Sequence, residues 1–219
     1  MTARIIAVAN QKGGVGKTTT CVNLAAAFAR MKYPVLLIDL DPQGNATTGV
    51  GIDPRRLHAS SCEVLLGERS ADETILRPEG LDLDLLPANG DLTAAEVTLL
   101  QMDRREFALK DALIPLREKY AWIFIDCPPS LNMLTLNALA AADSVLIPMQ
   151  CEYYALEGLT GLLNTVEQLR ASINPNLGIE GLVRTMFDGR NNLATAVSDE
   201  LVNNFGDRVY RTLVPRNIR

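Results

Sequence analysis

The feature of this sequence that most limits its possible folds is a set of short runs that are apolar at every position. Val-Leu-Leu-Ile at 35–38 and Trp-Ile-Phe-Ile at 122–125 show no alternation of polar and apolar residues. A strand of this kind is buried on both faces, which is typical of a parallel sheet covered by helices on both sides. The sequence therefore predicts an α/β fold with a doubly wound, mostly parallel sheet.

Such apolar runs alternate along the chain with longer Ala- and Leu-rich segments of helical spacing. The predicted strands are residues 4–9, 35–40, 81–86, 122–126, 144–149 and 179–184. The predicted helices are residues 17–31, 94–100, 105–116, 131–141, 157–171 and 194–205. No repeat or linker interrupts this pattern, and 219 residues fit one domain spanning 1–219. Ligands of such sheets bind beyond the carboxyl ends of the strands, so the site is expected there.

A glycine-rich loop at 10–19, Asn-Gln-Lys-Gly-Gly-Val-Gly-Lys-Thr-Thr, joins the first predicted strand to the first predicted helix. It is close to the phosphate-loop pattern GxxxxGK[ST], except that Gln11 stands in place of the first glycine. The glycines let backbone N–H groups approach phosphates, and the helix adds its positive end. Lys17 would reach the β- and γ-phosphates, and Thr18 would offer its hydroxyl to Mg²⁺. The predicted nucleotide-binding residues of this loop are Lys12, Gly13, Gly14, Val15, Gly16, Lys17, Thr18 and Thr19.

Lys12 is the unusual residue of this loop, because a single phosphate loop needs only one lysine. It lies five residues before Lys17, on the far limb of the loop. One interpretation is a solvated surface lysine. The other is a lysine that reaches a phosphate from outside, either its own or that of a second subunit, and the spacing alone leaves both open.

Acidic residues end two of the predicted strands. Asp39 and Asp41 lie two apart, so their carboxylates leave the sheet on the same face, where two like charges need a cation or a working role to offset them. We expect Asp41 to orient or activate the attacking water and Asp39 to lie near the water shell of the metal, although Asp-Pro also opens ordinary turns. Asp126 ends the apolar strand 122–126 and is predicted to support Mg²⁺, as in a Walker B motif.

Together these motifs resemble the ParA/Soj chromosome- and plasmid-partitioning ATPases, a group of P-loop ATPases with a deviant Walker A loop. The matching blocks are Lys-Gly-Gly-Val-Gly-Lys-Thr-Thr at 12–19, Asp-Leu-Asp-Pro-Gln-Gly-Asn-Ala-Thr at 39–47, Asp-Cys-Pro-Pro at 126–129, Leu-Asn-Ala-Leu at 136–139, Gln-Cys-Glu-Tyr-Tyr-Ala-Leu-Glu-Gly at 150–158 and Val-Pro-Arg-Asn-Ile-Arg at 214–219. The similarity covers essentially the whole chain. Family members usually continue for some tens of residues after the last block, so we expect the C-terminal tail of the family to be missing here.

The resemblance implies slow hydrolysis of ATP with Mg²⁺, stimulated by a ParB-type centromere-binding partner and by DNA. It implies a homodimer formed across ATP, in which Lys12 contacts phosphate of the second subunit. Asp41 matches the catalytic aspartate and would act together with Lys12 and Lys17. Met186 and Pro215 match walls of the adenine pocket. A protein of this kind is expected in the cytoplasm, associated with the nucleoid.

The net charge of −5 argues, taken alone, against a protein that binds nucleic acid. The charge is uneven, however: residues 1–183 carry −7, residues 184–219 carry +2, and the last twelve residues hold four arginines and no acid. Composition alone favours a solvated arginine face. The resemblance instead implies that Arg190 and Arg219 lie on the surface of the dimer that binds double-stranded DNA without sequence preference. Dimerisation would double the phosphate contacts, so ATP would control DNA binding.

Four other functions fit parts of the sequence. They are a division-site placement ATPase, an iron–sulfur carrier, a small-molecule kinase or ligase, and a nucleotide-switched DNA-binding scaffold with incidental turnover. The first would need an amphipathic membrane helix, which residues 1–219 do not contain. The four cysteines have no CxxC or CxxH spacing, which disfavours metal binding and predicts buried, reduced thiols. No apolar run reaches the length of a membrane helix or a signal peptide, so we expect no membrane association.

Overall fold

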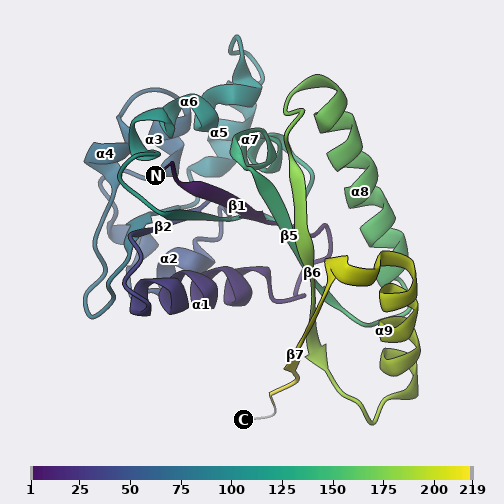
Figure 1. Ribbon diagram of the computed structural model, residues 1–219. Coiled ribbons are helices and arrows are strands. Elements are labelled where there is room, and N and C mark those ends of the chain that lie inside the picture. The colour runs from purple at the N-terminus through teal and green to yellow at the C-terminus, as the bar shows by residue number, and fades with distance from the viewer. Residues whose placement is uncertain (1, 218–219) are drawn as a thin grey trace.

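The structure is a computed structural model that describes residues 2–217, and its centre is a seven-stranded parallel sheet (Figure 1). The strands are β1 (Arg4–Val8), β2 (Val35–Asp39), β3 (Asp84–Leu86), β4 (Trp122–Asp126), β5 (Ser144–Gln150), β6 (Gly178–Phe187) and β7 (Val209–Pro215). Their order across the sheet is β3-β2-β4-β1-β5-β6-β7. Val8 and Asp39 are both register partners of Asp126, so the carboxyl ends of β1, β2 and β4 meet at one edge.

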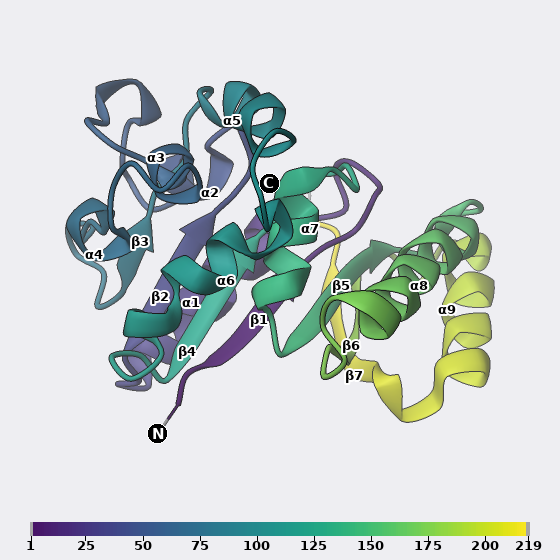
Figure 2. The same ribbon diagram turned by 90° about the horizontal axis from the view of Figure 1, so that it is seen from above.

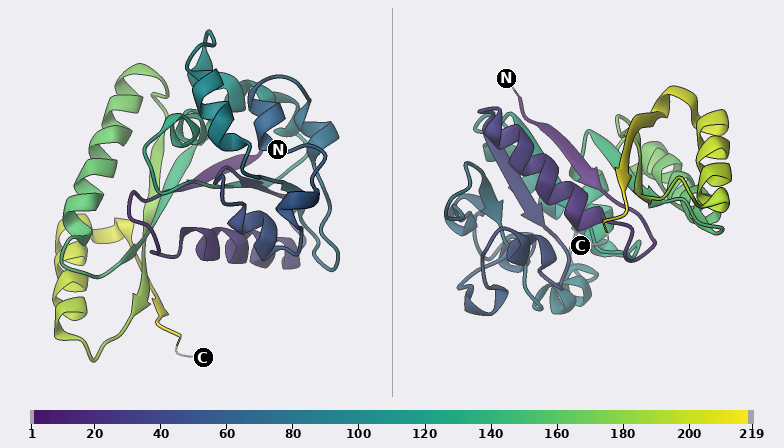
Figure 3. Two further views of the ribbon diagram at one scale, coloured as in Figure 1. Left: turned by 180° about the vertical axis from the view of Figure 1, so that it is seen from behind. Right: turned by 90° about the horizontal axis from the view of Figure 1, so that it is seen from below.

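Helices cover both faces of the sheet. The α-helices are α1 (Lys17–Arg30), α2 (Asn45–Gly49), α3 (Ser61–Leu65), α4 (Ala71–Thr74), α5 (Leu92–Leu99), α6 (Ala108–Ala112), α7 (Met133–Ala141), α8 (Ala155–Ser172) and α9 (Asn192–Phe205). The 3₁₀ turns are η1 (Pro54–Arg56), η2 (Arg105–Phe107), η3 (Ile114–Leu116) and η4 (Gly206–Arg208). Figure 3 shows α1 lying across one face of the sheet, and Figure 2 shows α7 between α5 and α8 on the other. This arrangement confirms the predicted α/β class.

Two apolar clusters hold these layers together. The smaller cluster joins α1 to the sheet, where Cys21, Ala25 and Ala29 pack against Leu37 and Phe124. The larger cluster lies between the sheet and the helices of the opposite face, from α3 through α9. The ring of Phe28 on α1 lies 4.7 Å from the ring of Trp122, edge to face, which fixes the far end of α1. The loop before α1 is therefore carried by a helix anchored along its length.

Two predicted elements differ from the structure. The predicted helix 105–116 is not continuous, because it is divided into η2, α6 and η3. Pro115 has no backbone N–H to donate, so a regular helix cannot continue to residue 116, and α6 ends before η3. The predicted strand 81–86 is shortened to β3, with only its last three residues paired to β2.

Strand β7 and the short helices between β2 and β3 were not predicted from the sequence. Every residue of β7 after Val209 is exposed, because the strand forms the edge of the sheet, so it lacks the apolar pattern of the inner strands. Helices α2, α3 and α4 have only four or five residues each, too few to display a helical period.

Two further expectations concern cysteines and membranes. All four cysteines are buried as free thiols, as their spacing predicted. Between residues 2 and 217, no helix has both the length and the apolar character that crossing a membrane requires.

Candidate nucleotide-binding site

The glycine-rich loop connects the end of β1 to the first turn of α1. Gly14 and Gly16 have φ angles of 75° and 85°, in the left-handed region that glycine adopts at low cost. Gly16 occupies the N-cap position of α1, where no side chain caps the helix and the first turn contains no acid. The first backbone N–H groups of α1 therefore remain available to an anion.

Two hydrogen bonds fasten this loop to neighbouring strands, and a third bond lies within the loop. The side-chain amide of Asn10 donates to the carbonyl oxygen of Pro148 at 2.8 Å and accepts from the backbone N–H of Lys12 at 3.0 Å. The hydroxyl of Thr185 on β6 donates to the carbonyl oxygen of Val15 at 2.7 Å. These bonds hold the loop in an open curve before any ligand is bound, which lowers the entropic cost of binding.

Lys17 lies inside the curve of the loop, with only 7% of its surface exposed. Its Nζ donates to the carbonyl oxygen of Lys12 at 3.0 Å. Burial lowers the pKa of Lys17, while the negative charges of Asp126 and Asp41 act in the opposite direction. The ammonium group therefore has one backbone partner that a phosphate oxygen can replace.

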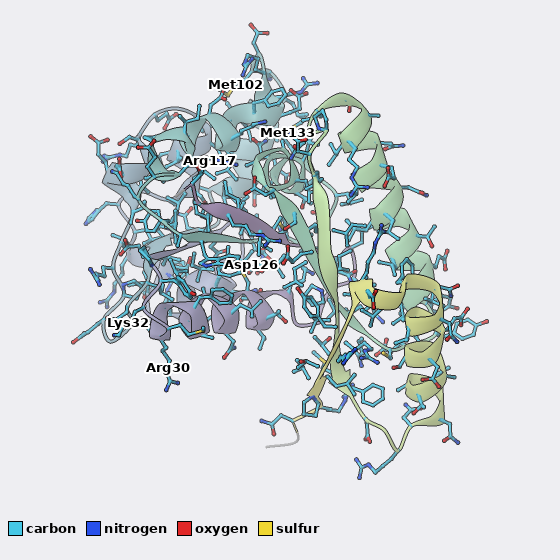
Figure 4. The ribbon with its side chains drawn as sticks, viewed as in Figure 1. Arg30, Lys32, Met102, Arg117, Asp126 and Met133 are labelled. Atoms are coloured by element: carbon cyan, nitrogen blue, oxygen red, sulfur yellow. The ribbon has the colours of Figure 1, made fainter. Side chains whose placement is uncertain are left out.

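Asp126 at the end of β4 is fully buried, and Figure 4 shows it in the interior of the molecule. Neither of its carboxylate oxygens meets the geometry of a hydrogen bond with the described residues. Burial raises the pKa of Asp126 to about 8, and the charges of Asp39 and Asp41 add to the effect, while Thr18 and Lys17 partly oppose it. A buried carboxylate that accepts no well-formed hydrogen bond is costly, and Lys17 and Thr18 offset only part of this cost, so the position favours a further cation.

The Asp39 carboxylate, by contrast, is fully engaged by its own chain. Its Oδ2 accepts from the backbone N–H and the hydroxyl of Thr47, both at 2.8 Å, and its Oδ1 accepts from the backbone N–H of Asp41 at 3.1 Å. Burial raises the pKa of Asp39 to about 6, although the bonds from Thr47 lower it. Asp39 lies next to Asp126 in the sheet register, so the two side chains belong to one acidic cluster.

Asp41 lies two residues further on and is only 7% exposed. Its Oδ1 accepts from the backbone N–H of Gln43 at 2.9 Å, which is the turn interaction that the Asp-Pro sequence suggested as an alternative. The bond occupies one carboxylate oxygen. The charge of Asp41 acts on both Lys17 and Asp126, which places this carboxylate beside the phosphate loop.

The acidic cluster is compatible with a cation that arrives together with a nucleotide. Within the described part of the chain, no three His, Cys, Asp or Glu side chains are arranged to hold a metal ion by themselves. Mg²⁺ usually keeps several waters and is bound through one or two carboxylates and substrate phosphates, rather than by a cage of protein ligands. The partnerless Asp126 carboxylate beside an uncapped helix end fits this mode of binding.

Lys12 projects from the far limb of the loop and forms an ion pair with Glu152, which lies between β5 and α8. The two side chains are 40% and 42% exposed, so the pair lies at the surface. The adjacent Tyr153 and Tyr154 are 74% and 68% exposed. The Lys12 ammonium is thus held by Glu152, and it is neither freely solvated nor directed into the space that the loop encloses.

The two residues predicted to wall an adenine pocket end neighbouring strands. Met186 on β6 has a φ of 50°, unusual for a side chain larger than glycine, and its Cε lies 4.0 Å from the position that a Cβ on Gly16 would take. Pro215 ends β7, where it is the register partner of Phe187. Both residues therefore lie at the carboxyl ends of β6 and β7, on the same edge as the loop.

Of the two arginines predicted to contact DNA, Arg190 is described and Arg219 lies outside the described residues. The Arg190 side chain is 82% exposed, and its Nε and Nη2 donate to the two carboxylate oxygens of Asp188 at 2.9 and 2.7 Å. Those bonds from Arg190 lower the pKa of Asp188 to about 2. The positive charge of Arg190 is therefore already balanced by the carboxylate of Asp188 in the same loop.

Two residues with clear structural roles escaped the sequence analysis. Thr47 holds Asp39 through two bonds, and its hydroxyl also accepts from the backbone N–H of Ala88, which links β2 to the segment after β3. Glu152 holds Lys12. Neither role has a local signal, because each partner is separated from the residue by a loop or by most of the chain.

Comparison with known proteins gives consistent results. Residues 3–179 match the AAA domain family. The chain is 53% identical to the chromosome partitioning protein ParA of Myxococcus xanthus, covering 99% of this chain and 76% of that protein. It is 49% identical to the sporulation initiation inhibitor protein Soj of Bacillus subtilis, covering 99% and 85%. A solved structure named cobyrinic acid a,c-diamide synthase from Mycobacterium smegmatis, with bound ATP analog and magnesium, superimposes with a TM-score of 0.93, 41% identity, and coverage of 99% and 88%.

Proposed function

This chain belongs to the ParA/Soj family of chromosome-partitioning ATPases, and from that premise we propose that it is an ATP-switched, DNA-binding ATPase. It binds ATP with Mg²⁺, dimerises across the nucleotide and binds DNA without sequence preference in that state. The observation that carries the proposal is the meeting of three features at one sheet edge. They are the start of α1, which no side chain caps, the Lys17 ammonium, whose bond to the carbonyl oxygen of Lys12 a phosphate can replace, and the Asp126 carboxylate, which accepts no well-formed hydrogen bond from the described residues.

In this proposal, different residues of the loop and its neighbours contact different parts of the nucleotide and its Mg²⁺. The backbone N–H groups of 13–18 surround the phosphates, and Lys17 exchanges the carbonyl oxygen of Lys12 for the β- and γ-phosphates. Thr18 and Asp126 would hold Mg²⁺, which when bound offsets the negative charge of the transferred phosphoryl group. Asp39 keeps its bonds to Thr47 and acts as the support that positions this edge of the sheet. Met186 and Pro215 bound the adenine.

Asp41 is the residue that we assign to the attacking water. The turn bond from Gln43 fixes its carboxylate through one oxygen and leaves the other able to accept a hydrogen bond from water. Asp41 is close enough to Lys17 and Asp126 for its charge to affect both of their pKa values. This proximity supports our assignment of Asp41 to orienting the nucleophile toward the phosphate that Lys17 would hold.

Lys12 supports the dimeric part of the proposal. Its side chain lies at the surface on the edge that carries the loop, where the phosphates of a second copy can approach it. To make that contact, Lys12 must leave Glu152, and an exposed ion pair costs little to break. In this dimer the Arg190 surfaces of both copies act together on DNA, and a ParB-type partner accelerates hydrolysis and so releases the DNA. The proposal places the protein in the cytoplasm, on the nucleoid.

The test is an ATPase assay with and without double-stranded DNA and an N-terminal peptide of a ParB-type protein. We expect slow basal release of ADP and phosphate that increases when both are added. The variant Lys17→Ala serves as the control, because it removes the phosphate-binding ammonium and should show neither ATP binding nor turnover. Wild-type protein that binds no ATP, or whose turnover is unaffected by DNA and peptide together, would contradict the proposal.

A second candidate comes from the name of the structural neighbour from Mycobacterium smegmatis, which denotes a synthase rather than a partitioning protein. A ligase on the same phosphate loop would join a second substrate after activating it with ATP. Product analysis separates the two functions, because a partitioning ATPase yields only ADP and phosphate. A product that contains a new amide or phosphoryl group would favour the ligase.

A further inference from the structure

A groove on the helical face away from α1 is not used by the proposed ATPase chemistry. It has a volume of about 520 Å³ and lies between α5 and α8, with α7 as its floor. Figure 2 shows α7 between these two helices, and Figure 4 shows Met133, its first residue, on the side of the sheet away from α1. We call it the α5–α8 groove; the residues used below are Glu96, Val97, Leu100, Leu131, Asn132 and Thr135.

The groove gathers apolar side chains that the fold leaves in water. Val97 and Leu100 are 63% and 53% exposed, and Leu131 is 40% exposed. The floor is also apolar, because α7 contains no charged residue over Met133–Ala141. Soluble proteins seldom expose large apolar residues together in one concave patch unless a partner covers them.

The charge of the groove narrows the choice of partner. Glu96 is the single charged residue among those that line it, and it forms no ion pair with the residues that the structure describes. No lysine or arginine lines the groove, so it does not fit DNA or an anionic membrane surface. The chemistry that fits is a protein segment with apolar side chains along one face and a lysine or arginine opposite Glu96.

The groove is connected to the candidate catalytic site through the segment 127–132, which runs from Asp126 to α7. Two bonds fasten this segment to α7: the backbone N–H of Thr135 donates to Asn132 at 3.1 Å, and the hydroxyl of Thr135 donates to the carbonyl oxygen of Ser130 at 2.6 Å. Asn132 and Thr135 both line the groove. A segment lying in the groove would therefore touch the residues that hold the α7 end of this loop, which begins directly after Asp126.

We propose that the α5–α8 groove is the docking site through which the ParB-type partner accelerates hydrolysis, and that the docked segment is amphipathic with a basic residue directed at Glu96. The inference rests on the proposed function and adds to it the surface and the chemistry of the partner. Apolar anchors of the segment cover Val97, Leu100 and Leu131. The coupling to hydrolysis passes through Asn132 and Thr135 to the loop after Asp126.

The test compares ATPase stimulation by a purified ParB-type protein, in the presence of DNA, among surface variants of the full chain. Val97→Asp and Leu100→Asp place a charge on the rim, and we expect each to raise the partner concentration for half-maximal stimulation by about tenfold or more. Basal turnover should be unchanged, since neither residue contacts the phosphate loop. The matched control is Ile114→Asp, because Ile114 is 64% exposed and lies in η3, outside the groove.

A second variant tests the charge. Glu96→Gln keeps the size of the side chain and removes its charge, and it should weaken stimulation about three- to tenfold and reduce the effect of salt on it. Wild-type stimulation that Val97→Asp and Leu100→Asp leave intact would overturn the inference while the proposed function stands. Loss of the ATP-dependent dimer in these variants, measured by light scattering, would assign the groove to a second copy and overturn it too. Failure of the wild type to respond to the partner would instead contradict the proposed function.

Discussion

At the scale of single residues, the Asp126 carboxylate is in a strongly unfavourable electrostatic environment. It is fully buried, both of its oxygens lack hydrogen-bond partners among the described residues, and it shares its surroundings with Asp39 and Asp41. Asp39 is also buried, but three donors from Thr47 and Asp41 offset part of its cost. Groups whose pKa is perturbed in this way are concentrated at functional sites, where stability is lost in favour of ligand binding.

This difference predicts that removing the charge of Asp126 stabilises the ligand-free protein. Folding raises the pKa of Asp126 from 3.8 to about 8, so the folded chain binds a proton that the unfolded chain has already released. The resulting loss of stability begins near pH 4, grows as the pH rises, and is complete above about pH 8. At pH 8 in EDTA, the free energy of unfolding of Asp126→Asn should therefore exceed that of wild type by about 1 kcal/mol or more, and the difference should vanish near pH 4.

Urea denaturation at several pH values, followed by circular dichroism, measures this difference. Adding ATP and Mg²⁺ at pH 8 provides the control, because it should stabilise the wild type and leave Asp126→Asn nearly unchanged. An Asn variant that is less stable than wild type at pH 8 without ligands would mean that the carboxylate has a favourable partner after all.

Asp41 should behave differently, because we assign it to turnover rather than to nucleotide binding. Asp41→Ala removes the carboxylate that we assign to the attacking water and leaves Lys17 and the loop in place. We expect ATP affinity within about threefold of wild type and a hydrolysis rate lower by about a hundredfold, the usual range for loss of a positioned base. Fluorescent-nucleotide titration and phosphate release measure the two quantities. Normal turnover in this variant would remove Asp41 from the mechanism.

At the scale of elements, the short helix α2 supports the site because it carries Thr47. Its N-cap residue, Gly44, has a φ of 61°, and a Cβ there would lie 2.9 Å from Cγ of Pro54 and 3.0 Å from the carbonyl oxygen of Ala88. The position therefore lacks both the backbone conformation and the space for a side chain.

Gly44→Ala is accordingly expected to lower the free energy of unfolding by about 2 kcal/mol or more, and to loosen the bonds from Thr47 to Asp39. Gly158→Ala is the matched control, because Gly158 lies in α8 with no atom within 4 Å of its added Cβ. That change should be neutral or stabilising, since alanine favours helix over glycine. Chemical denaturation compares the two, and equal stabilities would show that the Gly44 turn can shift to make room.

The sequence could predict those elements that have strong local signals. The all-apolar strands β2 and β4 and the loop before α1 were placed within a residue or two, because burial and phosphate binding both impose local patterns. The edge strand β7 was missed, since its exposed residues carry no such pattern. The pairs Lys12–Glu152 and Asp39–Thr47 form only when separate segments meet, so no spacing in the chain could indicate them.

At the scale of the whole molecule, two cations assigned to contacts with other molecules are held by carboxylates of the same chain. Lys12 pairs with Glu152, and Arg190 pairs with Asp188. Both pairs are exposed, so each contributes little to stability and can exchange its carboxylate for a phosphate. Under the proposed function, a chain with a net charge of −5 would bind DNA weakly as a monomer and gain affinity when two copies combine.

The dimer can be tested through Lys12. Lys12→Ala removes the ammonium proposed to contact the second copy, while Lys17 still holds the phosphates of its own nucleotide. We expect ATP binding to persist and the ATP-dependent dimer to be lost in light-scattering measurements. Lys32→Ala is a suitable control, because Lys32 is likewise an exposed lysine in an ion pair, with Asp82. A dimer of normal strength in Lys12→Ala would refute the contact across the interface.

The proposed DNA-binding surface around Arg190 can be tested against a closely matched control elsewhere in the chain. Arg190 and Arg55 are 82% and 89% exposed, and each makes the same two-bond pair with an aspartate two residues earlier, Asp188 or Asp53. Arg190→Glu should lower the DNA affinity of the ATP-bound dimer by about tenfold or more at low salt. Because each phosphate contact contributes about 0.9 to the slope of log affinity against log salt, losing one contact in each copy should reduce that slope by about 2. Arg55→Glu changes the net charge equally, so an equal loss of affinity there would show that overall charge, and not the surface around Arg190, governs DNA binding.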